Sequence, residues 1–331
     1  MKIFYDEASN LELHNFGITI PLTDRRVQRI IDFLDSAGIP KFPIDEIDSE
    51  FELSLRWLEE VHTPNYAKAV VSNDELTEKA LIDTFELFDT DGKPNRYDPS
   101  ESKYPLTELA KRSLRQVRGT VLAAEQALLD GGAFFLGGGF HHAMSFGGRG
   151  FCFVNDLVLA AKYIQKTHGI KQIWIIDVDV HKGDGTAELC CNDASIKTLS
   201  IHMGNGWPLD DEVRIPDYQA HPWYIPSDVD IPILNSEEDS YIERLEAGLE
   251  KLLETGEPDF IFIAQGSDPF EKDQLPSSSQ IKLSEDQMLA RDKLVWDLVK
   301  KLAVPHCYVM SGGYGDFSHI PFINFFKLVH G

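Results

Sequence analysis

The segment IWIIDVDVHKGDGTAE, residues 173–188, carries the strongest indication of both fold and chemistry. It starts as an apolar, β-rich run and ends in a cluster of aspartate and histidine. Side chains two residues apart in an extended chain share a face, so Asp177, Asp179 and His181 can project in the same direction. Ligands of parallel α/β sheets bind beyond the carboxyl ends of the strands. The segment therefore predicts a buried strand that ends at a binding site.

A strand-terminal turn that caps a following helix is the alternative explanation of these aspartates. It accounts well for Asp184, which lies where helical sequence begins. It accounts poorly for Asp177, because a carboxylate buried inside a strand without a partner costs several kcal/mol. A binding site explains both residues.

Short apolar runs alternate with amphipathic stretches along the chain, which is typical of βα units around a mainly parallel sheet. The predicted strands are 3–5, 133–135, 172–178, 196–202, 259–263 and 307–310. The predicted helices are 23–35, 107–129, 155–167, 239–255 and 284–302. Asn155 and Ser284 carry helix-start signals. We expect an α/β fold, in which one mainly parallel multi-stranded sheet has helices on both faces and forms a single domain over residues 1–331.

Composition narrows the classes of partner. The chain has 31 basic and 54 acidic residues and a net charge of -23, which opposes direct binding of nucleic acid. The acidic surface can attract cationic peptides or polyamines, or can serve solubility alone. Four cysteines without C-x-x-C spacing favour a reducing cytoplasm, and no apolar run reaches the ~18 residues of a membrane helix. We expect a cytoplasmic protein with no membrane partner, and the oligomeric state stays open.

A second strand-like run, FIFIAQGSD, ends at Asp268, which can supply a third ligand beside Asp179 and His181. Two carboxylates and one histidine leave a fourth position open for water, as in catalytic metal sites. Zinc is the first choice for such a set. Iron(II) suits a carboxylate-rich set as well, so the ligands alone leave the metal open.

Two glycine-rich segments add candidate catalytic groups. GGGFHH, residues 137–142, permits a tight bend that delivers His141 and His142, and an imidazole there can act as general base. SGGYG, residues 311–315, presents Tyr314, whose hydroxyl can donate a hydrogen bond to an oxyanion. Together with the metal ligands, these groups predict metal-assisted attack of water on a carbonyl.

The motifs GGGFHHA, GFCFVND, DVDVHKGDGT, TLSIH, GSDPFEKD and SGGYG follow one another in this order. In this combination the sequence resembles the zinc-dependent histone deacetylase superfamily, which includes acetoin-utilisation-type and acetylpolyamine deacetylases on an arginase-like α/β fold. The resemblance covers most of the chain, from HTPNYAKAV at 62–70 to SGGYG.

The resemblance implies a role for each matching residue. Zinc would be held by Asp179, His181 and Asp268. His142 would activate water and then protonate the leaving amine, with His141 beside it. The remaining implied positions are Asp177 and Asp184 as the orienting partners of His141 and His142, Tyr314 as oxyanion donor, Gly150, Phe151, Trp207 and Gly312 along the acyl-lysine tunnel, and Asp177, Asp179, His181, Ser200 and the backbone near Ile201 around a structural potassium ion.

Departures from the family pattern fall near the rim of the expected tunnel. Lys182 stands where many members have a second histidine, and the segment that follows Asp268 lacks the usual glycine-rich continuation. The N-terminal stretch HNFGITIPLTDRRVQRI lacks a common His-Pro-Glu-Arg pattern. The polar stretches 89–104 and 204–230 are expected as irregular loops at such a rim.

The leading functional hypothesis is an amidohydrolase that removes acetyl or other acyl groups from lysine side chains. The first alternative is a deacetylase of small N-acetyl amines such as acetylpolyamines, which an acidic tunnel mouth would favour. A second is a catalytically silent acyl-lysine-binding protein, although every expected metal ligand and the tyrosine are present. An arginase-type ureohydrolase needs a two-metal ligand set, which DVDVHKGDGT does not supply.

Overall fold

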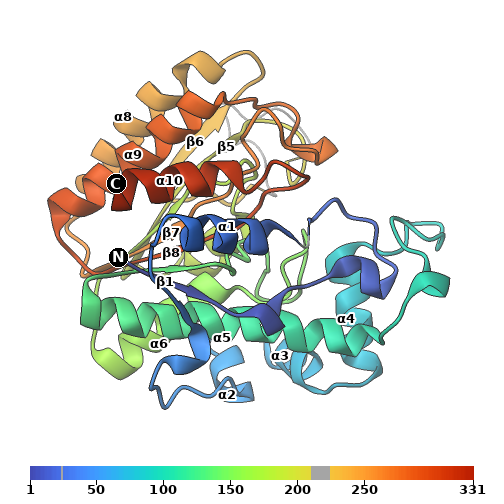
Figure 1. Ribbon diagram of the computed structural model, residues 1–331. Helices are drawn as coiled ribbons and strands as arrows, with labels where there is room; N and C mark the ends of the chain where they lie inside the picture. Colours follow the sequence, from blue (N-terminus) through green and yellow to red (C-terminus); the bar gives the residue numbers. More distant parts are fainter. Residues whose placement is uncertain (24, 210–223) are drawn as a thin grey trace.

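The computed structural model describes residues 1–23, 25–209 and 224–331. Its strands form one sheet in the order β2-β1-β3-β8-β7-β4-β5-β6, and each neighbouring pair is parallel (Figure 1). The strands are β1 (Lys2–Tyr5), β2 (Lys41–Pro43), β3 (Gly132–Phe135), β4 (Ile173–Asp177), β5 (Ile196–Met203), β6 (Val229–Ile233), β7 (Phe260–Ala264) and β8 (His306–Val309). The expected mainly parallel α/β sheet is confirmed.

Helices cover both faces of this sheet. In Figure 1, α1, α8, α9 and α10 lie on one side, and α5 and α6 lie on the other with α2, α3 and α4. The helices are α1 (Arg25–Ser36), α2 (Leu55–Leu58), α3 (Pro64–Val71), α4 (Glu75–Phe85), α5 (Leu106–Asp130), α6 (Asp156–His168), α7 (Asp184–Cys190), α8 (Tyr241–Leu253), α9 (Glu285–Leu302) and α10 (Ile320–His330). Within the described ranges, none combines the length and the apolar character that crossing a membrane requires.

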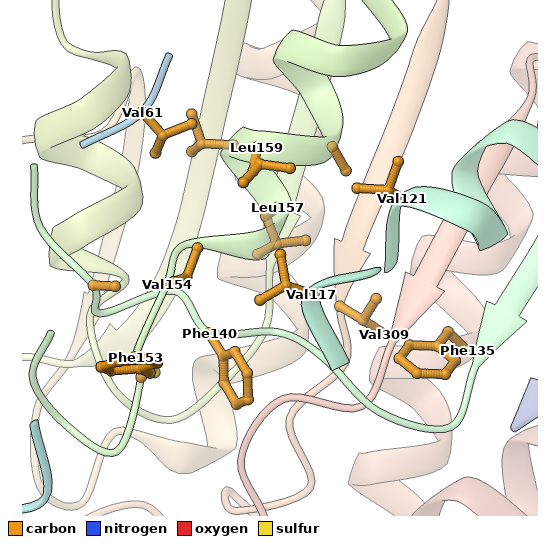
Figure 2. Close-up of a cluster of buried hydrophobic side chains, with 14 of the residues drawn as sticks. Val61, Val117, Val121, Phe135, Phe140, Phe153, Val154, Leu157, Leu159 and Val309 are labelled. Atoms are coloured by element: carbon orange, nitrogen blue, oxygen red, sulfur yellow. The ribbon is translucent and has the colours of Figure 1, made fainter. Parts of the chain in front are cut away.

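Two hydrophobic clusters sandwich the sheet because the central strands are apolar on both faces. Along β3, Phe134 packs into the cluster beneath α9 and α10, whereas Phe135 packs into the cluster beneath α5 and α6. Figure 2 shows the cluster beneath α5 and α6, where Val117 of α5 lies beside Leu157 of α6. This two-sided burial explains why the strands appear in the sequence as continuous apolar runs.

The expected helix starts at Asn155 and Ser284 are confirmed. The Asn155 side chain accepts a hydrogen bond from the backbone of Val158, and Ser284 forms a reciprocal capping box with Gln287. Such caps satisfy backbone N–H groups that have no partner inside the helix.

β6 and α10 are among the elements that were not predicted from the sequence. β6 begins inside the stretch 204–230 that was expected to be irregular, and it contains a proline, which an edge strand tolerates. Most of that stretch, residues 210–223, lies outside the described residues. α10 is mostly apolar, and it was not predicted as a helix.

The sheet order places four adjacent strands, β3, β8, β7 and β4, at the centre. Because they are parallel, their carboxyl ends meet at one edge, and the segments that carry the predicted site residues all leave from this edge. The topology thus gathers segments that lie far apart in the sequence.

Candidate metal centre and active site

Each central strand delivers one part of the site. β4 ends at Asp177 and runs on to Asp179 and His181, while β7 runs on to Asp268. β3 leads through the glycine turn to the histidine pair, and β8 leads to the turn that holds Tyr314.

Asp179, His181 and Asp268 form a compact buried cluster. One ligand atom from each of the three lies within 4.8 Å of the other two. His181 Nδ1 lies 3.2 Å from Asp179 Oδ1 and 3.1 Å from Asp268 Oδ2, so the ring nitrogen faces both carboxylates. The side chains are at most 4% exposed. This donor set fits a cation that prefers nitrogen and oxygen ligands.

Electrostatics at the cluster also favour a cation. Burial and the nearby Asp179 carboxylate raise the pKa of Asp268 to about 7. Although burial alone would lower the pKa of His181, the hydrogen bonds that its ring donates to the Asp179 and Asp268 carboxylates raise it to about 10. Two buried carboxylates side by side require a compensating positive charge, which a proton or a metal ion can provide.

Backbone and side-chain donors hold the carboxylates in place. Asp179 Oδ2 accepts hydrogen bonds from the Ser311 hydroxyl at 3.0 Å and from the Gly312 N–H at 2.8 Å. Asp268 Oδ1 accepts one from the Val180 N–H at 3.0 Å. The two carboxylates are therefore held by the loops that follow β8 and β4.

Two histidine–aspartate pairs lie beside the cluster. His141 Nδ1 lies 2.6 Å from Asp177 Oδ2, and His142 Nδ1 lies 2.7 Å from Asp184 Oδ1. The two rings are 3.9 Å apart between centroids. Asp184 is the first residue of α7, whose N-cap is Gly183, so its side chain serves His142 instead of capping the helix. A carboxylate on Nδ1 fixes the ring orientation and leaves Nε2 free for chemistry.

The two histidines differ in proton affinity. Burial and the charge of His141 lower the pKa of His142 to about 3. Burial opposes protonation of His141 as well, but the carboxylates of Asp177 and Asp179 raise its pKa to about 9. His142 is consequently the neutral ring that can accept a proton.

The glycine turn before the histidines is fixed by the start of α6. Gly138 and Gly139 have φ angles of 71° and 87°, a region that favours glycine. The buried Asp156 carboxylate accepts hydrogen bonds from the N–H groups of Gly139, at 2.9 Å, and Phe140, at 2.6 Å. Asp156 was not singled out from the sequence, because only the fold brings the start of α6 beside this turn.

Tyr314 lies on the loop after β8 and is anchored through its backbone. Its N–H donates to Asp273 Oδ2 at 2.6 Å, and Asp273 Oδ1 accepts from Leu275 N and Ser278 Oγ. The segment after Asp268 that departs from the family pattern thus supports the tyrosine. Sequence reasoning missed Asp273 because only the fold brings the two loops together.

The expected tunnel residues lie beside the histidines. Gly150 has a φ of 55°, and a Cβ built there would lie 2.2 Å from Trp207 and 2.7 Å from His142. The Trp207 ring packs edge-on against His142 at 4.5 Å, and the Phe151 ring lies 6.2 Å from that of Tyr314. Glycine at position 150 is therefore needed for the close approach of backbone and indole.

Two hollows meet at these residues. An inner cavity of about 70 Å³ is lined by His142, Asp179, His181, Gly312 and Tyr314 among others. An outer one of about 140 Å³ shares His142, His181 and Tyr314 and adds mouth residues. The mouth residues of the outer hollow include Glu86, Arg96, Trp207, Leu275 and Ser277.

The residues expected around potassium lie behind the cluster. Ser200 and Ile201 are buried on β5, and Ser200 pairs in register with Asp177 of β4. Ser200 Oγ lies 3.1 Å from His202 Nδ1 and 3.5 Å from the Gly183 N–H. The structure brings these residues together beside Asp177.

Lys182, where many family members have a second histidine, is buried instead of facing the cluster. Its ammonium group lies 2.6 Å from Asp230 Oδ1, and both side chains are at most 3% exposed. The buried charge is thus paired, as buried ions require.

The fold and this arrangement define a class of protein: a parallel α/β hydrolase with a histidine–carboxylate cluster that could hold a metal ion beside two histidine–aspartate pairs. The chain belongs to the histone deacetylase family, because the model of the histone deacetylase domain matches residues 20–321. It is a histone deacetylase-family hydrolase.

Individual relatives agree with this assignment. An uncharacterised protein of Picosynechococcus sp. is 32% identical over 80% of this chain and 77% of its own length. Histone deacetylase 2 of Arabidopsis thaliana is 27% identical over 95% of this chain and 74% of its own. The crystal structure of acetylpolyamine aminohydrolase from Burkholderia pseudomallei has a TM-score of 0.72 at 19% identity and covers 99% of this chain and 98% of its own. At this low identity, the similarity to the aminohydrolase structure shows a shared fold only.

Proposed function

We propose that this protein is a zinc-dependent lysine deacylase that hydrolyses the amide bond of acyl-lysine side chains. The observation that carries the proposal is a single cavity in which Tyr314 and His142 face the side of the cluster formed by Asp179 and His181. A base, a hydrogen-bond donor and a metal-ligand set then surround one point where a carbonyl can lie.

When bound at Asp179, His181 and Asp268, a zinc ion supplies Lewis acidity that polarises the carbonyl and activates water. His142 accepts the proton of that water at Nε2, since its Nδ1 is engaged with Asp184. Tyr314 donates its hydroxyl hydrogen bond to the oxygen on which negative charge develops. The water oxygen bonds to the carbonyl carbon, the C–N bond breaks, and His142 returns the proton to the leaving amine, so the products are a carboxylate and a free lysine side chain.

His142 suits the role of base better than His141. A general base must be neutral at working pH, and the lowered pKa of His142 keeps it neutral. His141, whose pKa is raised by the carboxylates of Asp177 and Asp179, would stabilise negative charge on the substrate oxygen. The metal can also be iron(II), and a potassium ion at Asp177, Asp179, His181, Ser200 and the Ile201 backbone would have a structural role.

The charge at the tunnel mouth favours acyl-lysine peptides over acetylpolyamines. Among the described mouth residues, Glu86 is the carboxylate, and it is paired with Arg96 at 3.0 Å. Arg96 also lies over the Phe151 ring at 5.4 Å. Recognition of a polycation requires unpaired carboxylates, and the ion pair with Arg96 neutralises the charge of Glu86.

We place the reaction in the cytoplasm, in one catalytic domain over residues 1–331, without a nucleic acid partner.

A substrate ranking tests this proposal. We expect kcat/KM for acetyl-lysine peptides to exceed that for acetylputrescine and acetylspermidine at least roughly tenfold, because the Glu86 carboxylate at the tunnel mouth is paired with Arg96. Longer acyl groups on the same peptide would establish the acyl preference. The opposite ranking would establish the polyamine alternative. Stoichiometric metal binding without turnover of any substrate would favour the silent acyl-lysine-binding alternative.

A further inference from the structure

Arg149 contacts both partners of the His142 ring. Its Nη1 lies 2.9 Å from Asp184 Oδ2, and its guanidinium lies 5.2 Å from the centre of the Trp207 ring. Asp184 holds His142 Nδ1, and Trp207 packs edge-on against the same ring. Resting on the function proposed above, we propose that Arg149 is a positioning residue that fixes His142 for proton transfer by holding Asp184 and Trp207 in place.

The backbone presents Arg149 at this point by means of a tight turn. Gly150 and Phe151 have φ angles of 55° and 68°, and Arg149 and Cys152 exchange backbone hydrogen bonds of 3.2 and 2.9 Å across them. Positive φ at both central residues is the signature of a type I′ turn. The turn that forms the tunnel wall therefore also fixes the position of the arginine.

The two oxygens of the Asp184 carboxylate bind different partners. Oδ1 accepts from His142 Nδ1 at 2.7 Å and from the Gly185 N–H at 3.0 Å, while Oδ2 faces Arg149. The Asp184 side chain is 13% exposed and that of Arg149 is 36% exposed, so the ion pair lies at the edge of the buried site. Without the arginine, Oδ2 loses its charged partner and the carboxylate is free to rotate away from the ring.

A surface ion pair of purely structural value would add little to folding stability and nothing to turnover. A positioning role predicts a different pattern. Loss of Arg149 should lower kcat while substrate binding stays intact, because the ring is misaligned only for proton transfer.

Kinetics of Arg149→Met separate these cases. Methionine keeps an unbranched apolar stem and removes the charge. We expect kcat for an acetyl-lysine peptide to fall roughly 10- to 100-fold, with KM within about threefold and with unchanged metal content. Arg149→Lys, which keeps the charge, should recover most of the loss. In the Asp184→Asn background, Arg149→Met should cost less than about twofold, since the partner is already altered.

Arg112 offers a matched control. It also pairs with a carboxylate, that of Glu12, and lies 5.5 Å from an aromatic ring, that of Phe16, but it contacts neither hollow of the site. Arg112→Met should leave kcat within about twofold of the unmodified protein. Unchanged kcat in Arg149→Met, or an undiminished loss in the Asp184→Asn background, would overturn the inference.

A second readout does not depend on turnover. The His142 Nδ1 proton, hydrogen-bonded to Asp184, should give a downfield NMR signal that exchanges slowly with water and exchanges faster in Arg149→Met, but not in Arg112→Met. Equal exchange in all three proteins would overturn the positioning role. Absence of turnover in the unmodified protein would instead refute the proposed function, while the NMR comparison would still decide the role of Arg149.

Discussion

At the residue scale, neighbouring groups give two adjacent histidines opposite proton affinities. The pKa of His141 rises to about 9 and that of His142 falls to about 3, although both rings are buried and both bind a carboxylate. The difference arises because Asp177 and Asp179 both act on His141, while the charge of His141 acts on His142. A charged ring and a neutral ring side by side can divide oxyanion stabilisation and proton transfer between them.

Tyr314→Phe tests the oxyanion role at this scale. The hydroxyl hydrogen bond strengthens only as charge develops on the carbonyl oxygen, so we expect kcat to fall roughly 10²- to 10³-fold and KM to change less than about threefold. Steady-state kinetics on an acetyl-lysine peptide would measure both. Full activity in Tyr314→Phe would refute the assignment.

The residue types of the site were predictable from the sequence, but several of their supports were not. Aspartates and a histidine at the end of an apolar run indicated metal ligands, since such groups are costly in a strand without a partner. Asp273 and Arg149 do not follow an apolar run in this way, so the sequence pattern did not indicate them. Their roles depend on contacts with Tyr314 and Asp184 that only the folded loops create.

At the element scale, the glycine-rich loop after β8 packs directly against Asp179 and Asp268, two of the proposed metal ligands. A Cβ at Gly312 would lie 2.3 Å from Asp268 Oδ2 and 2.5 Å from Asp179 Oδ2. Glycine is needed here for close approach of the loop, whose N–H also binds Asp179. The loop therefore shapes the ligand set as well as presenting the tyrosine.

Gly312→Ala should accordingly weaken metal binding. The added methyl group displaces two carboxylates that are fixed by other hydrogen bonds, and we expect metal affinity to fall roughly 10- to 100-fold. Competition with a chelator of known affinity would measure the change. Gly147→Ala is the control, because a Cβ there meets nothing within 4 Å. Equal affinities in the two variants would contradict this account of the loop.

The sequence predicted the central strands and the long amphipathic helices because burial on both faces and helical periodicity leave clear patterns. It did not predict β2, a three-residue edge strand, or α10, which is mostly apolar. Short or mostly apolar elements are specified by what packs on them, which a local pattern does not contain.

At the scale of the whole molecule, His62 links the start of α3 to the active-site loops. Its Nδ1 donates to the Met144 carbonyl at 2.8 Å, and its Nε2 accepts from the Asn155 N–H at 3.3 Å. The contact at Nε2 requires the neutral ring, because a protonated imidazole has no acceptor nitrogen. Burial accordingly lowers the pKa of His62 to about 4.

This histidine should make stability depend on pH. In the unfolded chain His62 is protonated below its ordinary pKa of about 6.5, whereas in the folded chain it stays neutral down to about pH 4. The contribution of His62 to stability is therefore complete above about pH 6.5 and declines as the pH falls towards 4. Between pH 7.5 and 5 this histidine should account for a loss of about 2 kcal/mol in the free energy of unfolding.

Urea unfolding of the unmodified protein and of His62→Gln at both pH values isolates the effect. Glutamine retains a donor and an acceptor but does not titrate, so the stability difference between the two proteins should shrink by about 2 kcal/mol at pH 5. Parallel stability curves would show that His62 does not titrate on unfolding.

The proposed function requires that Asp179, His181 and Asp268 hold the metal that makes this chain a deacylase. The most direct test is acetate release from an acetyl-lysine peptide by chelator-stripped protein as zinc or iron(II) is restored. We expect no turnover without metal, activity that reaches a plateau at about one metal ion per chain, and no recovery in Asp268→Asn. Full turnover by the stripped protein, or recovery of Asp268→Asn to the unmodified level, would contradict the proposed function.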